Sequence, residues 1–197
     1  MTGEDVFLKR LKAGDPLAFA KLVDENQGQI YNLALKMLGD PHEAEDVLQE
    51  TFLSAYKAVP DFEGRSSLGT WLYRIASNAS LMRLRKKQPD TISVDEPVTL
   101  DDGDSLPRQL ADWSNLPEEE LLSHETRQIM DDAISDLPES LRIVFVLRDI
   151  EGLSTAETGE VLDLSEGAVK TRLHRARLWL RERLSAYFSE RDDGQGH

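Results

Sequence analysis

The stretch from Leu153 to Leu184, LSTAETGEVLDLSEGAVKTRLHRARLWLRERL, decides the fold because it predicts two helices joined by a tight turn. The first helix is expected over Thr155 to Leu162, and the turn over Asp163-Leu164-Ser165. A longer helix is expected from Ser165 to Phe188. Two helices with a short turn between them form a helix-turn-helix arrangement, in which the second helix can enter a groove of DNA.

The second helix of this pair has an apolar face and a cationic face. Val169, Leu173, Ala176, Leu180 and Leu184 recur at helical spacing and predict the buried side. The basic side chains follow a different stripe, which suits a helix whose first turns meet base edges while its later arginines lie near phosphates. A solvated basic surface without a ligand is the alternative interpretation. The expected contacts with duplex DNA are Ser165, Lys170, Thr171, Arg172, His174, Arg175 and Arg177.

The N-terminal part of the chain also predicts helices. Asp15-Pro16 and Asp40-Pro41 each supply an N-cap followed by proline at the first helical position. These signals, with glycines and prolines as stops, divide the segment into helices. The expected helices are a short one around Asp5 to Leu11, then Pro16 to Leu38, Pro41 to Val59, and a last one from Ser67 or Thr70 to Lys87.

Between the two helical parts lies an acidic segment. From Gln88 to Glu125 there are 11 acidic residues against the single Arg108, which accounts for most of the net charge of -14. Residues 88–117 also contain four prolines and no sustained apolar period, so they predict a flexible linker. The run Ile143 to Leu147 could be a buried strand, but its helical neighbours favour a helix. We therefore expect an all-α fold of two small helical domains, 1–87 and 118–188, followed by a tail at 189–197.

Composition excludes several classes of protein. The chain has no cysteine, and its four histidines are scattered, so neither a disulfide framework nor a metal site is expected. No glycine-rich phosphate loop or nucleophile motif is present, which predicts that the protein is not an enzyme and needs no cofactor. No stretch approaches the roughly 18 apolar residues of a membrane span, and the first residues lack a signal-peptide core. We expect a soluble cytoplasmic protein.

Three C-terminal segments carry a family resemblance. DLPESLR (136–142), LRDIEGLSTAE (147–157) and GAVKTRLHRAR (167–177) resemble the region-four domain of extracytoplasmic-function (ECF) sigma factors of the sigma-70 family. The resemblance implies that this domain reads the minus-thirty-five element of promoters. Thr158 and Gly159 depart from the family, which usually has a larger apolar residue and an alanine there. This departure predicts a looser first helix.

A second resemblance lies in the predicted helix from Pro41 to Val59. Its residues Asp46, Gln49, Glu50 and Leu53 are spaced so that they share one side, apart from the apolar residues of the core side. The segment AEDVLQETF (44–52) resembles sigma region two, which in the family docks on the coiled coil of the polymerase beta-prime clamp. The resemblance gives these side chains a polymerase-binding role, whereas the helix alone would suggest a solvated acidic face.

The segment that follows resembles the part of sigma region two that captures the minus-ten element. It begins DFEGRSSLGTWLYRIASN (61–78), and from Thr70 to Lys87 it has five basic residues and no acidic one. Cations can follow the backbone of melted DNA while an extruded base is held in a pocket. Helical spacing places Trp71 in the core. The resemblance implies contacts from Phe62, Ser66, Arg74 and Asn78, with Arg83, Arg85, Lys86 and Lys87 on the DNA backbone.

Together the two segments imply an alternative sigma factor that directs RNA polymerase core enzyme to specific promoters and promotes melting of the DNA. The implied partners are the beta-prime clamp and beta flap of the polymerase, promoter DNA as duplex and as melted single strand, and an anti-sigma factor. The net charge of -14 motivates an alternative. It is a sigma-like interaction protein, or mimic, that binds an anti-sigma factor without binding DNA.

Overall fold

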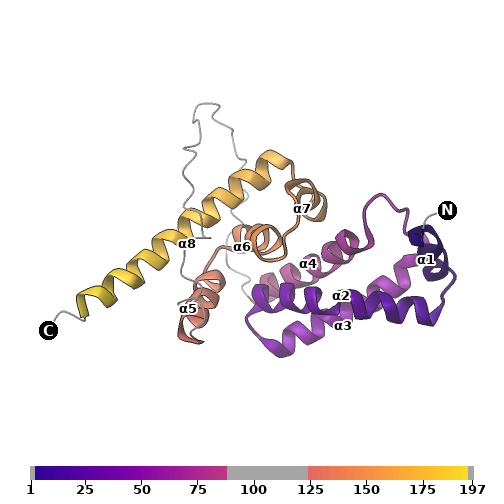
Figure 1. Cartoon of the computed structure of the whole chain (residues 1–197), viewed down its shortest axis with the longest axis horizontal. Coiled ribbons are helices and arrows are strands. Elements are labelled where there is room, and N and C mark those ends of the chain that lie inside the picture. Colours follow the sequence, from indigo (N-terminus) through magenta and orange to yellow (C-terminus); the bar gives the residue numbers. More distant parts are fainter. Residues whose placement is uncertain (1–2, 88–123, 195–197) are drawn as a thin grey trace.

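A computed structural model describes residues 3–87 and 124–194, and within these ranges the chain forms helices and no strand (Figure 1). The predicted linker at 88–117 lies outside the described residues. The expected all-α fold is confirmed. The elements are α1 (Gly3–Lys12), α2 (Pro16–Leu38), α3 (Pro41–Ala58), the 3-10 turn η1 (Val59–Asp61), α4 (Leu68–Lys87), α5 (His124–Ser135), α6 (Glu139–Phe145), the π-helical turn η3 (Val146–Ile150), α7 (Thr155–Leu162) and α8 (Glu166–Gly194).

The starts of α2 and α3 are fixed by the predicted caps. The Asp15 carboxylate accepts hydrogen bonds from the backbone N–H groups of Leu17 and Ala18, and Asp40 accepts from His42 and Glu43. These bonds satisfy amides that have no partner within the helix. Helix α2 is continuous and ends at Gly39, whose φ of 69° is the left-handed conformation that glycine adopts without strain.

Helices α2, α3 and α4 pack on one another, and α1 covers one end of this N-terminal bundle. Its core contains Leu22, Ile30, Phe52 and Leu72. A second buried cluster consists mostly of small side chains. Small residues there allow the backbones of the helices to come close. The members of this second cluster are Ala34, Ala44, Val47 and Ala79.

In the C-terminal half, the run from Ile143 to Leu147 is buried throughout and helical, as predicted. A helix that is apolar on all sides must be covered on all sides. Here α8 packs against α6, α2 and α4 also pack against α6, and α2 packs against η3. The hydrophobic run therefore lies between the two halves of the protein.

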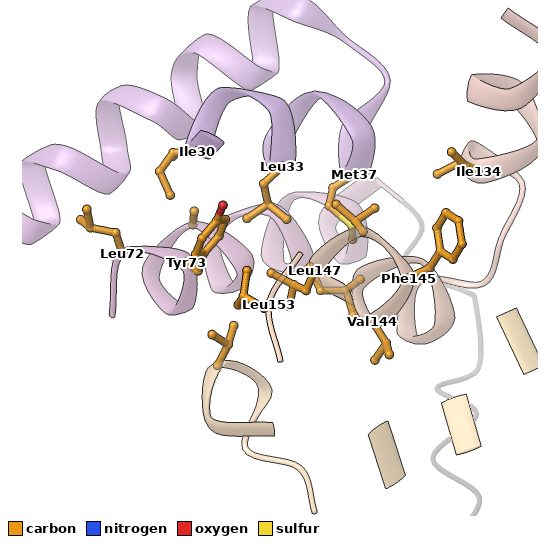
Figure 2. Close-up of a cluster of buried hydrophobic side chains, with 14 of the residues drawn as sticks. Ile30, Leu33, Met37, Leu72, Tyr73, Ile134, Val144, Phe145, Leu147 and Leu153 are labelled. Atoms are coloured by element: carbon orange, nitrogen blue, oxygen red, sulfur yellow. The ribbon is translucent and has the colours of Figure 1, made fainter. Parts of the chain in front are cut away.

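The two halves share one hydrophobic core. Figure 2 shows Leu33 and Met37 of α2 and Tyr73 of α4 beside Leu147 and Leu153 of the C-terminal half. All five side chains are buried and belong to a single cluster. The sequence predicted two domains joined by a linker, and the structure adds that the two helical parts are packed directly against each other.

Polar contacts surround this shared core. The Tyr73 hydroxyl donates to Oε2 of Glu151 at 2.8 Å. Nη1 of Arg142 donates to the Met37 carbonyl at 2.6 Å, while its other nitrogens donate to the carbonyls of Ser135 and Leu137. Two ion pairs complete the set: Lys36 with Asp131, and Arg85 with Glu139 at 3.3 Å. The interface between the halves therefore contains both apolar and specific polar contacts.

Burial changes the acid–base properties of the Tyr73–Glu151 pair. Removal from water raises the pKa of Glu151, and the hydrogen bond from Tyr73 partly opposes that rise. Burial, and then the hydrogen bond to Glu151, raise the pKa of Tyr73 above its ordinary value. Tyr73 therefore stays protonated and remains the donor to the Glu151 carboxyl group.

The helix-turn-helix has the predicted elements. A capping box begins α7, because the Ser154 hydroxyl accepts from the Glu157 N–H while the Glu157 carboxylate accepts from the Ser154 N–H. Asp163 ends the helix in the left-handed conformation, with a φ of 56°. A Cβ added at Gly159 would lie 2.7 Å from the Leu164 carbonyl oxygen, so Gly159 permits close packing of the turn. The departure from the family at this position thus has a packing role.

Candidate DNA-binding and partner-binding surfaces

Helix α8 presents the cationic face that its sequence predicted. The five residues of the apolar stripe from Val169 to Leu184 are all buried, which confirms the predicted core side. On the other sides, Lys170 and Arg175 are exposed, and Thr171, Arg172 and His174 are half-buried. The only ion pair of Lys170 among the described residues is an exposed one with Glu166 at 4.0 Å. A positively charged surface is therefore free to meet DNA.

Besides Lys170, two of the residues predicted to bind duplex DNA have partners within the protein. Arg177 forms a double ion pair with Asp149, with N–O distances of 2.7 and 2.8 Å. The hydrogen bond with Asp149 raises the pKa of the Arg177 guanidinium. Arg177 would have to leave Asp149 to reach a phosphate. The Ser165 hydroxyl accepts from the Ala168 N–H at 3.1 Å and so caps the first turn of α8, although the side chain is exposed.

The minus-ten residues predicted on α4 and in the segment before it differ in exposure. Arg74 and Asn78 are exposed one turn apart on α4, and Ser66 is half-buried in the preceding loop. Phe62 is only 8% exposed and packs on Trp71, with 4.9 Å between ring centroids. Trp71 therefore covers the Phe62 ring in this structure, and a base could reach the ring only if this packing changed. The expected core position of Trp71 agrees with this packing.

Most of the cations at the end of α4 are paired. Arg83 contacts Glu50 at 3.1 Å and Asp46 at 3.5 Å, and Lys87 contacts Glu43 at 2.6 Å. Arg85 remains 67% exposed despite its ion pair with Glu139. Lys86 is exposed and has no ion pair among the described residues. The predicted basic stretch is thus less available to DNA at Arg83 than at the neighbouring positions.

The acidic surface of α3 has the predicted geometry. Asp46, Gln49, Glu50 and Leu53 are all exposed, while Val47 and Thr51 between them are buried. Leu53 is 62% exposed and adds an apolar side chain to this acidic surface. The surface therefore combines carboxylates, an amide and one apolar side chain, a mixture suited to a protein partner with cationic and apolar groups.

Sequence reasoning did not identify the contacts between the two halves. Arg142 gave a weak signal, because an arginine between Leu141 and Ile143 interrupts an apolar run. Its guanidinium ties α6 to the end of α2 and to the α5–α6 connection. No local pattern distinguishes Tyr73 or Glu151, whose contact joins residues 78 positions apart.

Two further findings concern the described residues. None of their His, Asp and Glu side chains cluster in groups of three or more that could hold a metal ion. Within the same ranges no helix combines the length and the apolar character that crossing a bilayer requires.

Family models match both halves of the chain. The model for sigma-70 region 2 matches residues 22–89, and the model for sigma-70 region 4 matches residues 127–180. The first match contains α3 and α4, and the second contains α6, α7 and the basic part of α8. The matches therefore include all the predicted contact residues on these surfaces.

Curated relatives match over most of the chain. The ECF RNA polymerase sigma factor SigW of Bacillus subtilis is 42% identical, over 90% of this chain and 94% of its own length. The ECF RNA polymerase sigma-E factor of Escherichia coli K12 is 36% identical, over 88% of this chain and 90% of its own length.

Solved structures share the fold. CnrH, in complex with the cytosolic domain of CnrY, has a TM-score of 0.66 at 24% identity and covers 92% of this chain and 96% of its own. The sigma factor RpoE from Bartonella quintana, in complex with the anti-sigma factor NepR, has a TM-score of 0.61 at 21% identity, over 85% and 96% of the two chains. Given two matching regions in order and relatives aligned along nearly their full length, the chain belongs to the ECF sigma factors of the sigma-70 family.

Proposed function

We propose that this protein, as an alternative sigma factor, binds RNA polymerase core enzyme through α3 and directs it to promoters through α4 and α8. The observation that carries the proposal is the separation of charge on the folded chain. Exposed carboxylates lie on α3, whereas exposed cations lie on α4 and α8. A chain with a net charge of -14 can bind DNA when its cations are concentrated on separate surfaces.

The proposal assigns each surface a partner. Asp46, Gln49, Glu50 and Leu53 contact the beta-prime clamp, and the region-four domain contacts the beta flap. In the minus-ten element, Arg74 and Asn78 contact the melted strand while the exposed cations Arg85 and Lys86 follow its backbone. In the minus-thirty-five element, the N-terminal turns of α8 enter the major groove. The α8 contacts are Lys170, Thr171, Arg172, His174 and Arg175. The domain limits 1–87 and 118–188 are part of the same proposal.

Binding both promoter elements requires the two halves to separate. The elements lie about 25 base pairs apart, which corresponds to roughly 85 Å along B-form DNA. In this structure α4 packs against α7, the helix next to α8, within the same hydrophobic core. With its two halves packed together, the protein can therefore place either α4 on the minus-ten element or α8 on the minus-thirty-five element, but not both at once. We propose that binding to polymerase and promoter opens the shared core.

Regulation and location follow from the same proposal. Two solved structures with this fold are complexes, one with the cytosolic domain of CnrY and one with the anti-sigma factor NepR. We propose that an anti-sigma factor likewise binds this chain, and that it acts in the cytoplasm with RNA polymerase. The role is that of a non-catalytic initiation factor. The mimic alternative is motivated by the net charge alone, and the exposed Lys170 and Arg175 on α8 argue against it.

Transcription with purified components tests the proposal. Core polymerase with and without this protein would be supplied with a library of genomic promoter fragments, and the transcripts would be mapped. Promoter-specific transcripts that depend on the protein are expected. Binding to core polymerase without specific transcripts would favour the mimic, and failure to bind core polymerase would refute both the function and the α3 assignment.

A further inference from the structure

We propose that Arg83 is a positioning residue of the α3 surface, and that it holds Asp46 and Glu50 in place for cations of the partner instead of contacting DNA. The inference rests on the proposed function, because it assumes that α3 is the polymerase-binding surface. It also revises the sequence-based assignment of Arg83 to the DNA backbone.

Arg83 contacts two acidic side chains of α3 at once. Asp46 and Glu50 lie one turn apart on α3, where two like charges repel each other. Arg83 reaches across from α4 and contacts both, with Nη2 at 3.1 Å from Glu50 and Nη1 at 3.5 Å from Asp46. A planar guanidinium can donate to two carboxylates at once, which an ammonium group does with less directional control. Arg83 therefore relieves the repulsion and fixes both side chains.

Arg83 is less exposed than the two carboxylates that it contacts. The side chain of Arg83 is 31% exposed, whereas those of Asp46 and Glu50 are 63% and 54% exposed. The Nε atom of Arg83 is fully buried. An approaching molecule therefore meets the carboxylates before it meets the guanidinium. A DNA phosphate at this position would face two negative groups for one positive group, an unfavourable balance of charge.

Each of the two carboxylates keeps one oxygen that a partner can use. Arg83 occupies one oxygen of each carboxylate, and the other oxygens, Oδ1 of Asp46 and Oε1 of Glu50, accept no hydrogen bond from any described residue. Each ionised carboxylate can accept several hydrogen bonds. Two acceptors one helical turn apart match two arginine or lysine side chains that are also one turn apart on a helix. The partner surface is therefore a helix with cations at that spacing, next to apolar groups that cover Leu53.

Arg83→Met and Lys86→Met form a matched pair for the test. Both residues lie near the end of α4, but Lys86 is exposed and has no ion pair with the described residues. Full-length variants would be measured first for binding to core polymerase without DNA, and then, as assembled holoenzyme, for binding to promoter DNA over a range of salt concentrations. We expect Arg83→Met to weaken core binding about threefold to tenfold, the scale of ordering one or two side chains.

The kinetics separate positioning from simple charge. Arg83→Met makes the surface more negative, so association with a cationic partner should be as fast or faster, and the loss should appear in the dissociation rate. Arg83→Lys should restore part of the affinity. In a double-mutant cycle, Glu50→Gln should cost less affinity in the Arg83→Met background than in the wild type. Lys86→Met should leave core binding unchanged. It should lower by about one the number of counterions released on DNA binding, which the salt dependence of the affinity measures.

Two outcomes would overturn the inference. In one, Arg83→Met leaves core binding unchanged and lowers the DNA salt dependence as Lys86→Met does, which would make Arg83 a phosphate contact. In the other, Arg83→Met lowers only thermal stability, with additive effects in the cycle, which would make it merely structural. Failure of the wild-type protein to bind core polymerase would instead refute the proposed function. The failure of the proposed function and the failure of the Arg83 inference are therefore distinguishable.

Discussion

Tyr73→Phe removes one hydroxyl group from the interface between the two halves, and its consequences can be worked out from the structure. The hydroxyl donates to the Glu151 carboxyl group at 2.8 Å in a partly buried position. A hydrogen bond to a charged group contributes about 1.5–3 kcal/mol, and the partial exposure of Glu151 reduces this to about 1–2 kcal/mol. For a chain of this length, that loss corresponds to a fall in Tm of about 2–8 °C.

The pH dependence gives a second, independent signature. Burial raises the pKa of Glu151 in the folded protein, so the folded state binds a proton more readily than the unfolded state. The free energy of unfolding should therefore fall as pH rises from the unfolded pKa of Glu151 through its folded pKa, and then stay lower. The hydrogen bond from Tyr73 lowers the pKa of Glu151, so Tyr73→Phe should extend this fall to higher pH. Glu151→Gln should abolish it.

Urea unfolding of the full chain, followed by far-ultraviolet circular dichroism at a series of pH values, measures both effects. The variants needed are Tyr73→Phe, Glu151→Gln and the double variant, because the differences between them isolate this pair from other titrating carboxylates. At neutral pH, Tyr73→Phe should destabilise the protein more in the wild-type background than in the Glu151→Gln background. The reasoning is refuted if Tyr73→Phe leaves both the unfolding midpoint and its pH dependence unchanged.

Four further variants, one of them a control, test other parts of the structure. Gly159→Val should lower the free energy of unfolding by at least about 2–3 kcal/mol, because its Cβ would collide with the Leu164 carbonyl. Gly28→Val is the control: the space around Gly28 is open, so this change should not destabilise α2. Thermal melting of the two variants compares them. Leu147→Ala, fully buried between the halves, should lower the free energy of unfolding by about 2–5 kcal/mol in urea. Lys170→Gln should reduce the salt dependence of holoenzyme binding to duplex promoter DNA by about one ion, while core binding stays unchanged.

Local sequence signals predicted the helices well because each signal acts within one turn. The Asp-Pro pairs mark the starts of α2 and α3, and the Ser154–Glu157 capping box begins α7. In each case the residue and the amide that it caps are two or three positions apart. The end of α8 has no such signal, and the helix continues to Gly194, beyond the expected end at Phe188. Helix α4, in contrast, begins at Leu68, close to its predicted start at Ser67 or Thr70.

The availability of the predicted contact residues depends on partners that are distant in sequence. Arg177 meets Asp149 from 28 positions away, and Arg83 meets Glu50 from 33 positions away. Helical spacing placed Arg177 on the cationic stripe, and the family resemblance assigned Arg83 to the DNA backbone. Neither signal can tell whether a carboxylate from another element already compensates the charge. Arg74 lies on the same helix as Arg83, yet it has no ion pair with the described residues.

The tertiary pairing of charges therefore decides which cations are available to DNA. A cation that already neutralises a protein carboxylate releases less free energy on meeting a phosphate, because the first pair must break. The cost is greatest where the pair is double and half-buried, as between Arg177 and Asp149, and smallest where it is long and exposed, as between Lys170 and Glu166. We therefore expect the N-terminal turns of α8 to make its main DNA contacts, while Arg177 holds the helix-turn-helix against η3 through Asp149.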